Sequence, residues 1–366
     1  MAIVMAIGLL MLATLTQAQT GPVLETVAVL DDPPGNITVA PDGTVLVSVH
    51  PSLTPRYVAL AIHQGEVHAF PTGAWSTVLH QEARAGQAGM LPVLGIRAGA
   101  DGLVWMLSGF AGQSVKHLYA WDMNNDQLRH DFQFSAPPAV AQGSFFNDLA
   151  LAPRHNAIFI SDPAAGNNAA IVVVNMSTGE GRRRLEGHAS VRAEAVTAYI
   201  DGKVLGTPGP DGETLPLRGD VNPITIDAAQ QWLYYGAMSG RSVYRVRVAD
   251  LLDDALSPAE LGARVERYAD KAISAGITMD DDGNVYVADI QANGIGLATP
   301  EAYRVIVQDP LRLSWPDGIS VGPDGYVYTG SNSLFRSFAS HSGEGGPKPP
   351  FYITRFKALG PTTSGR

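Results

Sequence analysis

The chain has 366 residues and a formal net charge of −10, and it contains no cysteine. The acidic balance and the lack of long Lys/Arg runs exclude a nucleic-acid-binding protein, because phosphate backbones require clustered positive charge. The absence of cysteine excludes disulfides, zinc–thiolate centres and thiol nucleophiles. The 39 glycines and 25 prolines exclude a mainly helical protein, since both residues destabilise helix interiors.

The first segment of the chain is an uncharged, almost wholly apolar run at residues 2–15, followed by a small-residue cleavage site at Thr16-Gln17-Ala18. The run is shorter than the roughly 20 residues that span a bilayer, and it is typical of a signal peptide. A buried N-terminal helix is the alternative. We expect residues 1–18 to be a signal peptide, which makes the protein secreted or periplasmic. Residues 19–366 are then a single domain that does not insert into membranes.

Six copies of one pattern follow a lone strand at residues 24–30. In each copy a polar or glycine corner leads into alternating apolar residues, a turn that is often Asp-Gly, and a second alternating run. Each copy predicts a β-hairpin. Repeated units with room for four short strands are typical of a β-propeller. The copies lie at residues 35–47, 94–106, 146–160, 221–235, 275–287 and 316–328.

The repeats predict an all-β protein, a six-bladed β-propeller. Only one clear strand, at residues 351–356, follows the last hairpin. The strand at residues 24–30 is therefore expected to join the last blade and close the ring, because an open sheet edge is a pairing liability. An open stack of sheets is the alternative. Outside the strands, residues 248–256 have room for one turn of helix.

The corner residues of the six hairpins are expected to meet at one mouth of the central channel, because all inner strands run in one direction. Four of the six corners carry a carboxamide or a carboxylate, which suit polar ligands or a hard cation such as Ca²⁺. Turn capping by Asn and Asp is the structural alternative. We expect Asp148 or Asp317 to serve as a catalytic base. The corners are Asn36, Gly95, Asn147 with Asp148, Asn222, Ala275 with Gly276, and Asp317.

Aromatic residues flank these corners, and two of them, Phe146 and Trp315, are candidates for stacking on a flat ligand. Packing between blades is their alternative role. Asn36, Asn147 and Asn222 complete the predicted ligand contacts. Among the histidines, His50 lies just past the first hairpin and is the most channel-like. A surface loop is nevertheless its expected place. No phosphate-binding loop or serine-nucleophile motif is present in the sequence.

Five segments carry a resemblance to a known family: Phe146-Asn147-Asp148-Leu149-Ala150, residues 232–239, Leu313-Ser314-Trp315-Pro316-Asp317-Gly318, residues 324–332 and residues 349–356. With matched order and spacing from about residue 25 to 358, the chain resembles the major royal jelly protein/Yellow family. Bacterial members of this family are dopachrome-tautomerase-related proteins. The resemblance implies a secreted six-bladed propeller that binds a small aromatic ligand, dopachrome- or catecholamine-like, in its channel and in some members isomerises it.

A more distant resemblance, to gluconolactonase-like propellers, implies a calcium ion held by Glu, Asn, Asn and Asp at these corners. Asn147 and Asn222 match the two Asn ligands, whereas Gly35-Asn36 and Ala275 replace the acidic ones, so this calcium site is incomplete. A calcium-dependent lactonase or esterase and a non-catalytic binding scaffold are therefore the alternative functions. Ca²⁺ is the one cofactor that the sequence suggests. We expect a small-molecule ligand, no nucleic acid, and a monomer.

Overall fold

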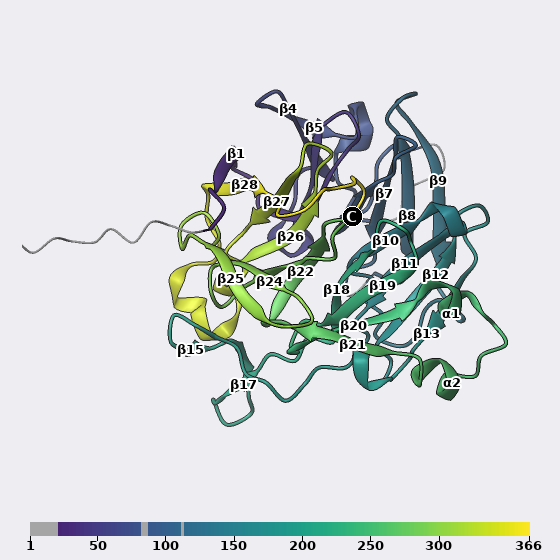
Figure 1. The fold of residues 1–366 in the computed structure, drawn as a ribbon. Helices are drawn as coiled ribbons and strands as arrows, with labels where there is room; N and C mark the ends of the chain where they lie inside the picture. The colour runs from purple at the N-terminus through teal and green to yellow at the C-terminus, as the bar shows by residue number, and fades with distance from the viewer. Residues whose placement is uncertain (1–20, 82–86, 111–112) are drawn as a thin grey trace, which may run out of the picture.

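The computed structural model describes residues 21–81, 87–110 and 113–366. The expected signal peptide, residues 1–18, lies outside these ranges. Within them, no helix is long and apolar enough to cross a bilayer. Figure 1 shows the sheets arranged in a ring around a common centre.

Six four-stranded antiparallel sheets make up the described ring, which confirms the predicted six-bladed β-propeller. The first blade contains β2 (Pro34–Val39), β3 (Val45–Val49), β4 (Ala59–His63) and β5 (Glu66–Phe70). The second contains β6 (Gly95–Ala98), β7 (Leu103–Ser108), β8 (Lys116–Asp122) and β9 (Gln127–Phe134). The third contains β10 (Leu149–Ala152), β11 (Ala157–Asp162), β12 (Ala170–Asn175) and β13 (Gly181–Arg184).

The remaining three blades follow the same plan until the last strand. The fourth contains β18 (Val221–Ile226), β19 (Trp232–Ala237), β20 (Ser242–Arg247) and β21 (Glu266–Asp270). The fifth contains β22 (Ser274–Met279), β23 (Val285–Asp289), β24 (Gly294–Ala298) and β25 (Tyr303–Gln308). The sixth combines β26 (Pro316–Val321), β27 (Tyr326–Ser331) and β28 (Phe351–Lys357) with β1 (Glu25–Leu30), which pairs antiparallel with β28.

The first two strands of each blade are the six hairpins expected from the sequence. The Asp-Gly turns form because glycine adopts a positive φ without steric cost. Gly43 has φ 85° and Gly325 has φ 82°, for example, and a Cβ added at either position would meet no heavy atom within 4 Å. Backbone conformation, and not crowding, therefore favours glycine there. Asp42 accepts a hydrogen bond from the Thr44 backbone N–H at 2.9 Å, which fixes the first of these turns.

The innermost strands pack around the channel in chain order. β2 contacts β6, β6 contacts β10, and the series continues through β18, β22 and β26, which contacts β2 again. A register shift interrupts the pairing of four inner strands, namely β2, β18, β22 and β26. Such β-bulges add a residue to one strand and redirect side chains. The corners expected before the strands at 36, 222, 275–276 and 317 are therefore bulges within the strands.

Two insertions lie outside the blade pattern and pack against each other. The first, between blades three and four, contains β14 (Tyr199–Ile200), β15 (Lys203–Val204), β16 (Gly206–Pro208) and β17 (Thr214–Pro216). The second, between β27 and β28, contains the 3₁₀ turns η5 (Leu334–Ser337) and η6 (Ala339–Glu344). They meet where His341 Nε2 lies 3.2 Å from the Ile200 carbonyl oxygen. The remaining short turns are η1 (Pro51–Leu53), η2 (Gly73–Ser76), η3 (Pro153–His155) and η4 (Ala189–Val191).

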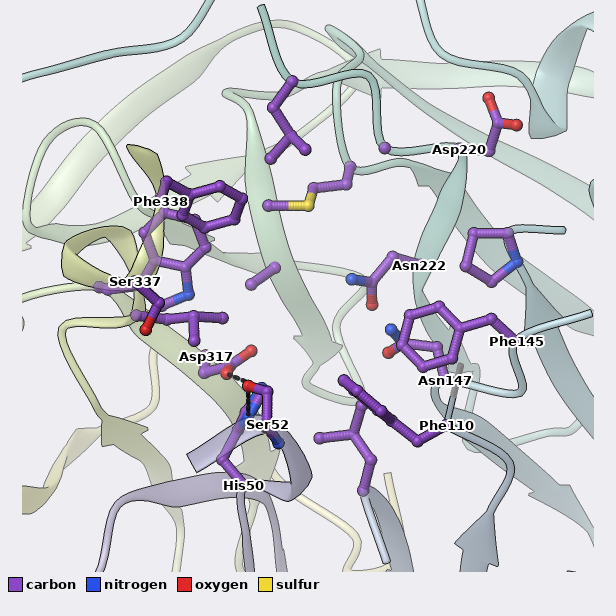
Figure 2. A pocket seen from close by; sticks show the side chains of 18 of the residues that line it. His50, Ser52, Phe110, Phe145, Asn147, Asp220, Asn222, Asp317, Ser337 and Phe338 are labelled. Carbon is purple, nitrogen blue, oxygen red and sulfur yellow. Dashed lines mark hydrogen bonds and ion pairs between the residues drawn. The ribbon is translucent and has the colours of Figure 1, made fainter. Parts of the chain in front are cut away.

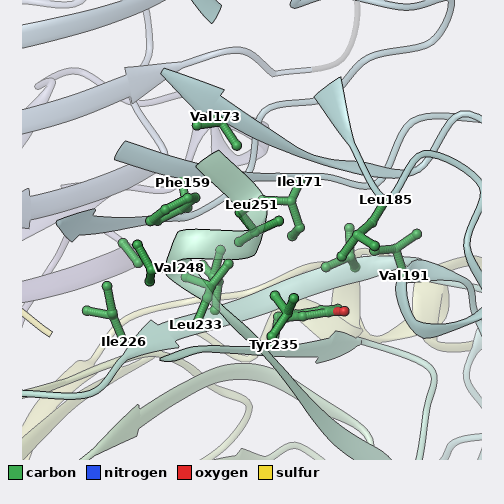
Figure 3. Close-up of a cluster of buried hydrophobic side chains, with 14 of the residues drawn as sticks. Phe159, Ile171, Val173, Leu185, Val191, Ile226, Leu233, Tyr235, Val248 and Leu251 are labelled. Carbon is green, nitrogen blue, oxygen red and sulfur yellow. The ribbon is translucent and has the colours of Figure 1, made fainter. Parts of the chain in front are cut away.

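The hydrophobic core lies between neighbouring blades, and the cluster between blades three and four is typical. Two short helices, α1 (Val248–Leu252) and α2 (Pro258–Gly262), cover this cluster, and α1 confirms the helical turn expected after residue 248. Val248 and Leu251 of α1 pack among Phe159 and Leu233, as Figure 3 shows. Burying each large apolar side chain contributes about 1.5–3 kcal/mol. A rigid frame of this kind holds the channel mouth in place.

Candidate functional site

A cavity of about 450 Å³ lies at the corner end of the channel. It is bounded by inner-strand bulges on one side and by loops and both insertions on the other. Figure 2 shows Asn147 and Asn222 on one side of this space and His50 with Asp317 on another. The residues that line it include His50, Ser52, Phe110, Phe145, Asn147, Arg218, Asp220, Asn222, Met238, Trp315, Asp317, Ser337 and Phe338.

Four of the sequence-predicted site residues meet in this cavity: Asn147, Asn222, Trp315 and Asp317. They come from blades three, four and six, so only the closed ring brings them together. Close approach of the inner strands makes this possible. A Cβ atom at Gly318 would lie 2.5 Å from the Asn36 Cα, too close for any side chain.

Two asparagine side chains of the cavity wall have unengaged carboxamides. Within the described residues, neither the Asn147 nor the Asn222 carboxamide hydrogen-bonds to another protein group; Asn147 is held instead by its backbone N–H, which donates to the Ser161 carbonyl at 3.0 Å. A turn-capping Asn would use its side chain locally. These two amides are therefore free to donate to and accept from a bound molecule.

Asp317 is the carboxylate that an inner-strand corner supplies to this cavity. Its Oδ2 accepts a hydrogen bond from Asn332 Nδ2 at 2.7 Å. Asn332 is fully buried and also donates to the Pro34 carbonyl at 2.8 Å, which fixes the amide in place. Burial raises the pKa of Asp317 to about 7; the Asn332 hydrogen bond opposes this shift and the charge of Asp148 adds to it. Asp317 can therefore exchange a proton near neutral pH.

His50 lies in the cavity wall, so the expectation of a surface loop was wrong. The residue is only 5% exposed, because η1 turns the chain inward directly after β3. Its Nδ1 accepts a hydrogen bond from the Ser52 backbone N–H at 3.3 Å, and its Nε2 lies 3.9 Å from Asp317 Oδ2. Burial lowers the pKa of His50 to about 4, so the ring is neutral at pH 7. The contact with Asp317 is then not an ion pair.

Aromatic rings form two facing walls of the cavity. Trp315 stacks on Phe338 with 5.9 Å between ring centroids, and Phe110 meets Phe145 edge to face at 5.0 Å. Figure 2 shows Phe338 on the left of the cavity and Phe110 and Phe145 on the right. The Trp315 backbone has φ 56°, rare for a bulky residue, and its buried Nε1–H has no partner in the described structure. Phe110 and Phe338 carry no sequence signal, since both come from irregular loops.

The structure does not bring Asn36, Asp148 and Phe146 to the cavity. Asp148 Oδ1 accepts hydrogen bonds from Asn36 Nδ2 at 2.6 Å and from Arg97 Nη2 at 3.2 Å. Burial raises the pKa of Asp148, and Arg97 opposes that shift. Phe146 is fully buried and packs on Phe134 between blades. Asn36 and Asp148 are thus structural partners of Arg97, and Phe146 belongs to the core.

The donor set of the cavity does not fit a calcium ion. Ca²⁺ takes six to eight oxygens, and its affinity depends on the number of carboxylates. Here the corners supply two amides and the single carboxylate of Asp317. The Asp220 carboxylate at the mouth already accepts from the Ala193 backbone N–H at 2.6 Å. Across the described ranges, no group of three or more His, Asp or Glu residues is arranged to hold a metal ion.

The fold and the site define a six-bladed β-propeller with a polar and aromatic cavity at one mouth of its channel. Residues 102–344 match the family model described as major royal jelly protein. The chain therefore belongs to the major royal jelly protein family. No curated protein matches the chain significantly.

Solved structures similar to this chain share its fold. A luciferin-regenerating enzyme is 12% identical with a TM-score of 0.56, covering 94% of this chain and 98% of that one. A gluconolactonase from Xanthomonas campestris is 11% identical with a TM-score of 0.54, covering 91% and 88%. The calcium-binding protein regucalcin from Agrobacterium tumefaciens is 12% identical with a TM-score of 0.51, covering 92% and 97%. At these identities the likeness concerns the propeller fold alone.

Proposed function

We propose that the cavity binds a small, flat aromatic compound with polar substituents, of the dopachrome or catecholamine type, and that tautomerisation is the reaction it suits. The observation that carries this proposal is the pair of facing aromatic walls, Trp315 with Phe338 and Phe110 with Phe145, around two unengaged amides. Flat rings gain stacking energy between such walls. Ring hydroxyl or carbonyl groups would meet the amides of Asn147 and Asn222.

The size of the cavity supports a ligand of this class. A volume of about 450 Å³ lies within the range of roughly 300–1,000 Å³ that small-molecule sites occupy. The lining is mainly apolar with a few convergent polar groups, which is typical of sites that recognise small organic molecules. The resemblance of the sequence to Yellow proteins implies the same class of ligand.

Tryptophan fluorescence tests the binding directly, because Trp315 lies in the cavity wall. Dopamine and freshly prepared dopachrome are titrated into the purified protein. We expect saturable quenching that the Trp315→Phe variant loses. Phe338→Ala should weaken binding at least tenfold by removing one stacking surface. Leu311→Ala, which truncates a side chain that is 70% exposed outside the cavity, is the matched control and should bind normally.

Calcium provides the contrast with a metal-dependent hydrolase. Because the donor set carries too little negative charge for Ca²⁺, we expect that neither added Ca²⁺ nor EDTA changes the affinity for dopamine. Saturable calcium binding together with calcium-dependent hydrolysis of a lactone would replace this proposal by the lactonase function. If neither dopamine nor dopachrome quenches the fluorescence of Trp315, the proposed class of ligand is wrong.

A further inference from the structure

We propose that Asp317 and His50 form a proton-transfer pair that isomerises the bound ring compound: Asp317 carries the proton, and the Nε2–H of His50 hydrogen-bonds to the ligand oxygen without leaving the ring. This inference rests on the proposed function and adds the reacting groups and the class of substrate. The substrate must carry an acidic C–H conjugated with a ring carbonyl. Dopachrome is a probe with this chemistry.

The geometry of Asp317 leaves one oxygen free for the reaction. Oδ2 accepts from Asn332 Nδ2 at 2.7 Å, whereas Oδ1 has no hydrogen-bond partner among the described residues. The side chain is 16% exposed, and this exposure is to the cavity that it lines. Asn332 therefore positions the carboxylate without occupying both of its oxygens. A general base must be held in this way, within reach of the proton that it removes.

The tautomer of His50 follows from its partners. The Ser52 backbone N–H can only donate, so Nδ1 must accept and cannot carry the proton of a neutral ring. In the neutral imidazole the hydrogen therefore lies on Nε2. This atom is 3.9 Å from Asp317 Oδ2, too far for a direct hydrogen bond, so the N–H remains available to a ligand in the cavity beside both groups. Figure 2 shows the side chains of His50, Ser52 and Asp317 grouped together on one side of the cavity.

The step requires no oxidant, metal or co-reactant. The Asp317 carboxylate removes the proton from the ligand carbon, and the C–H electron pair moves through the conjugated system onto the ring carbonyl oxygen. The Nε2–H of His50 stabilises that oxygen by hydrogen bonding and keeps its proton, since losing it would leave an imidazolate. The Asp317 carboxylic acid then delivers its proton to the oxygen. The product is an isomer of the substrate, and both residues return to their starting states.

The other charged groups around the pair do not substitute for it. Arg218 and Asp220 also line the cavity. Arg218 donates to the Val196 carbonyl, whereas Asp220 Oδ1 accepts from the Ala193 backbone N–H and lies 3.6 Å from Arg192 Nε, so this carboxylate is paired with an arginine and not placed beside a histidine. Asp148 is bound by Arg97 and Asn36 outside the cavity. His50 and Asp317 are therefore the described acid–base side chains that lie side by side in the wall of the cavity.

The test measures dopachrome turnover, by loss of its visible absorbance, together with dopachrome binding for the same variants. Asp317→Asn retains an acceptor for Asn332 and the shape of the side chain, but it cannot take up a proton. We expect turnover to fall at least 100-fold while the dissociation constant changes less than about threefold. His50→Gln retains an N–H donor in altered geometry and should lower turnover about tenfold or more.

Matched controls replace the same residue types elsewhere on the surface. Asp211→Asn and His68→Gln should retain the wild-type turnover, since both residues are exposed and outside the cavity. Wild-type turnover by Asp317→Asn, with binding intact, would overturn the proton-transfer pair. Tight binding of dopachrome by the unmodified protein without faster isomerisation would also overturn it, while the proposed binding function would stand. Absence of binding would remove the proposed function itself.

Discussion

Asn147 and Asp148 are neighbours in the chain but belong to two regions with opposite properties. Asn147 and Asn222 face the cavity, and neither amide has a hydrogen-bond partner among the described residues. Asp317 faces the cavity as well, and one of its two carboxylate oxygens is free. Asp148 points the other way, into a buried network with Asn36 and Arg97, where its Oδ1 accepts three hydrogen bonds. The comparison shows that a polar corner residue either faces the cavity or holds neighbouring blades together. Two adjacent residues can take these two different roles, because successive side chains point in different directions.

The largest effect is expected from breaking the buried network. Arg97→Met removes the positive charge beside Asp148 and leaves a buried carboxylate without its ionic partner. Breaking a buried pair of this kind typically costs about 3–5 kcal/mol. Urea denaturation should show this loss. Arg56→Met is the control, because the Arg56 side chain is 70% exposed at 3.8 Å from Asp32 and should change stability by less than about 1 kcal/mol. Equal effects of the two variants would contradict the distinction between the regions.

The next largest effect concerns Asp317 and His50, which should change the free energy of unfolding with pH in opposite directions. The folded-state pKa of Asp317 is raised to about 7, so its contribution is full below about pH 4 and is lost as pH rises toward 7. The folded-state pKa of His50 is lowered to about 4, so its contribution is full above about pH 6.5 and is lost as pH falls toward 4. Between about pH 4 and 6.5 the two contributions to the free energy of unfolding therefore change with pH in opposite directions.

Single variants should expose each slope. Relative to the unmodified protein, Asp317→Asn should make the change in the free energy of unfolding from pH 4 to 6.5 more positive, because the opposing Asp317 contribution is removed. His50→Gln should make this change more negative, because the His50 contribution is removed. Each change is of the order of 1–3 kcal/mol. Denaturant titrations at a series of pH values measure it, and parallel curves for both variants and the unmodified protein would show that these groups do not titrate in the folded state as described.

A smaller effect on stability is expected where the side chains face the cavity. Asn147→Ala and Asn222→Ala remove groups that form no hydrogen bond within the described protein, so each should change the free energy of unfolding by no more than about 1 kcal/mol. Binding of dopamine should nevertheless weaken severalfold. Gln127→Ala, on the exposed outer strand of the second blade, is the control for both measurements. A large loss of stability with unchanged binding would identify these residues as turn caps.

The smallest effect concerns the leader. We propose that residues 1–18 are removed on export, and their loss should leave the stability and ligand affinity of the propeller unchanged. Mass spectrometry of protein recovered outside the cytoplasm should find Gln19 at the N-terminus. Exported protein that still begins with Met1 would contradict this processing.

The propeller could be predicted from sequence because its signal is local and repeated. Alternating apolar residues and Asp-Gly turns such as Asp42-Gly43 define each hairpin independently of the others. The cavity could be predicted only in part. Asn147, Asn222, Trp315 and Asp317 share the corner position, and the ring symmetry brings equivalent positions to one mouth. The bulges that redirect these residues were not evident from the pattern.

Residues outside the repeat could not be placed from sequence. His50 enters the cavity because a single 3₁₀ turn redirects the chain, and Phe338 because the insertion after β27 folds over the mouth. Asp148 was expected to face the channel, but its direction depends on Arg97 of the neighbouring blade. Contacts of this kind join residues far apart in the chain, and a single sequence gives no periodicity from which to find them.

The close approach of the inner strands has one more consequence. At Gly276 a Cβ would lie 2.5 Å from the Asp317 carbonyl oxygen, and at Gly318 it would lie 2.5 Å from the Asn36 Cα. Only the hydrogen side chains of these two glycines fit between the fifth, sixth and first blades. Any larger group would push these blades apart and widen the central channel. The width of the cavity therefore depends on two glycines that do not line it.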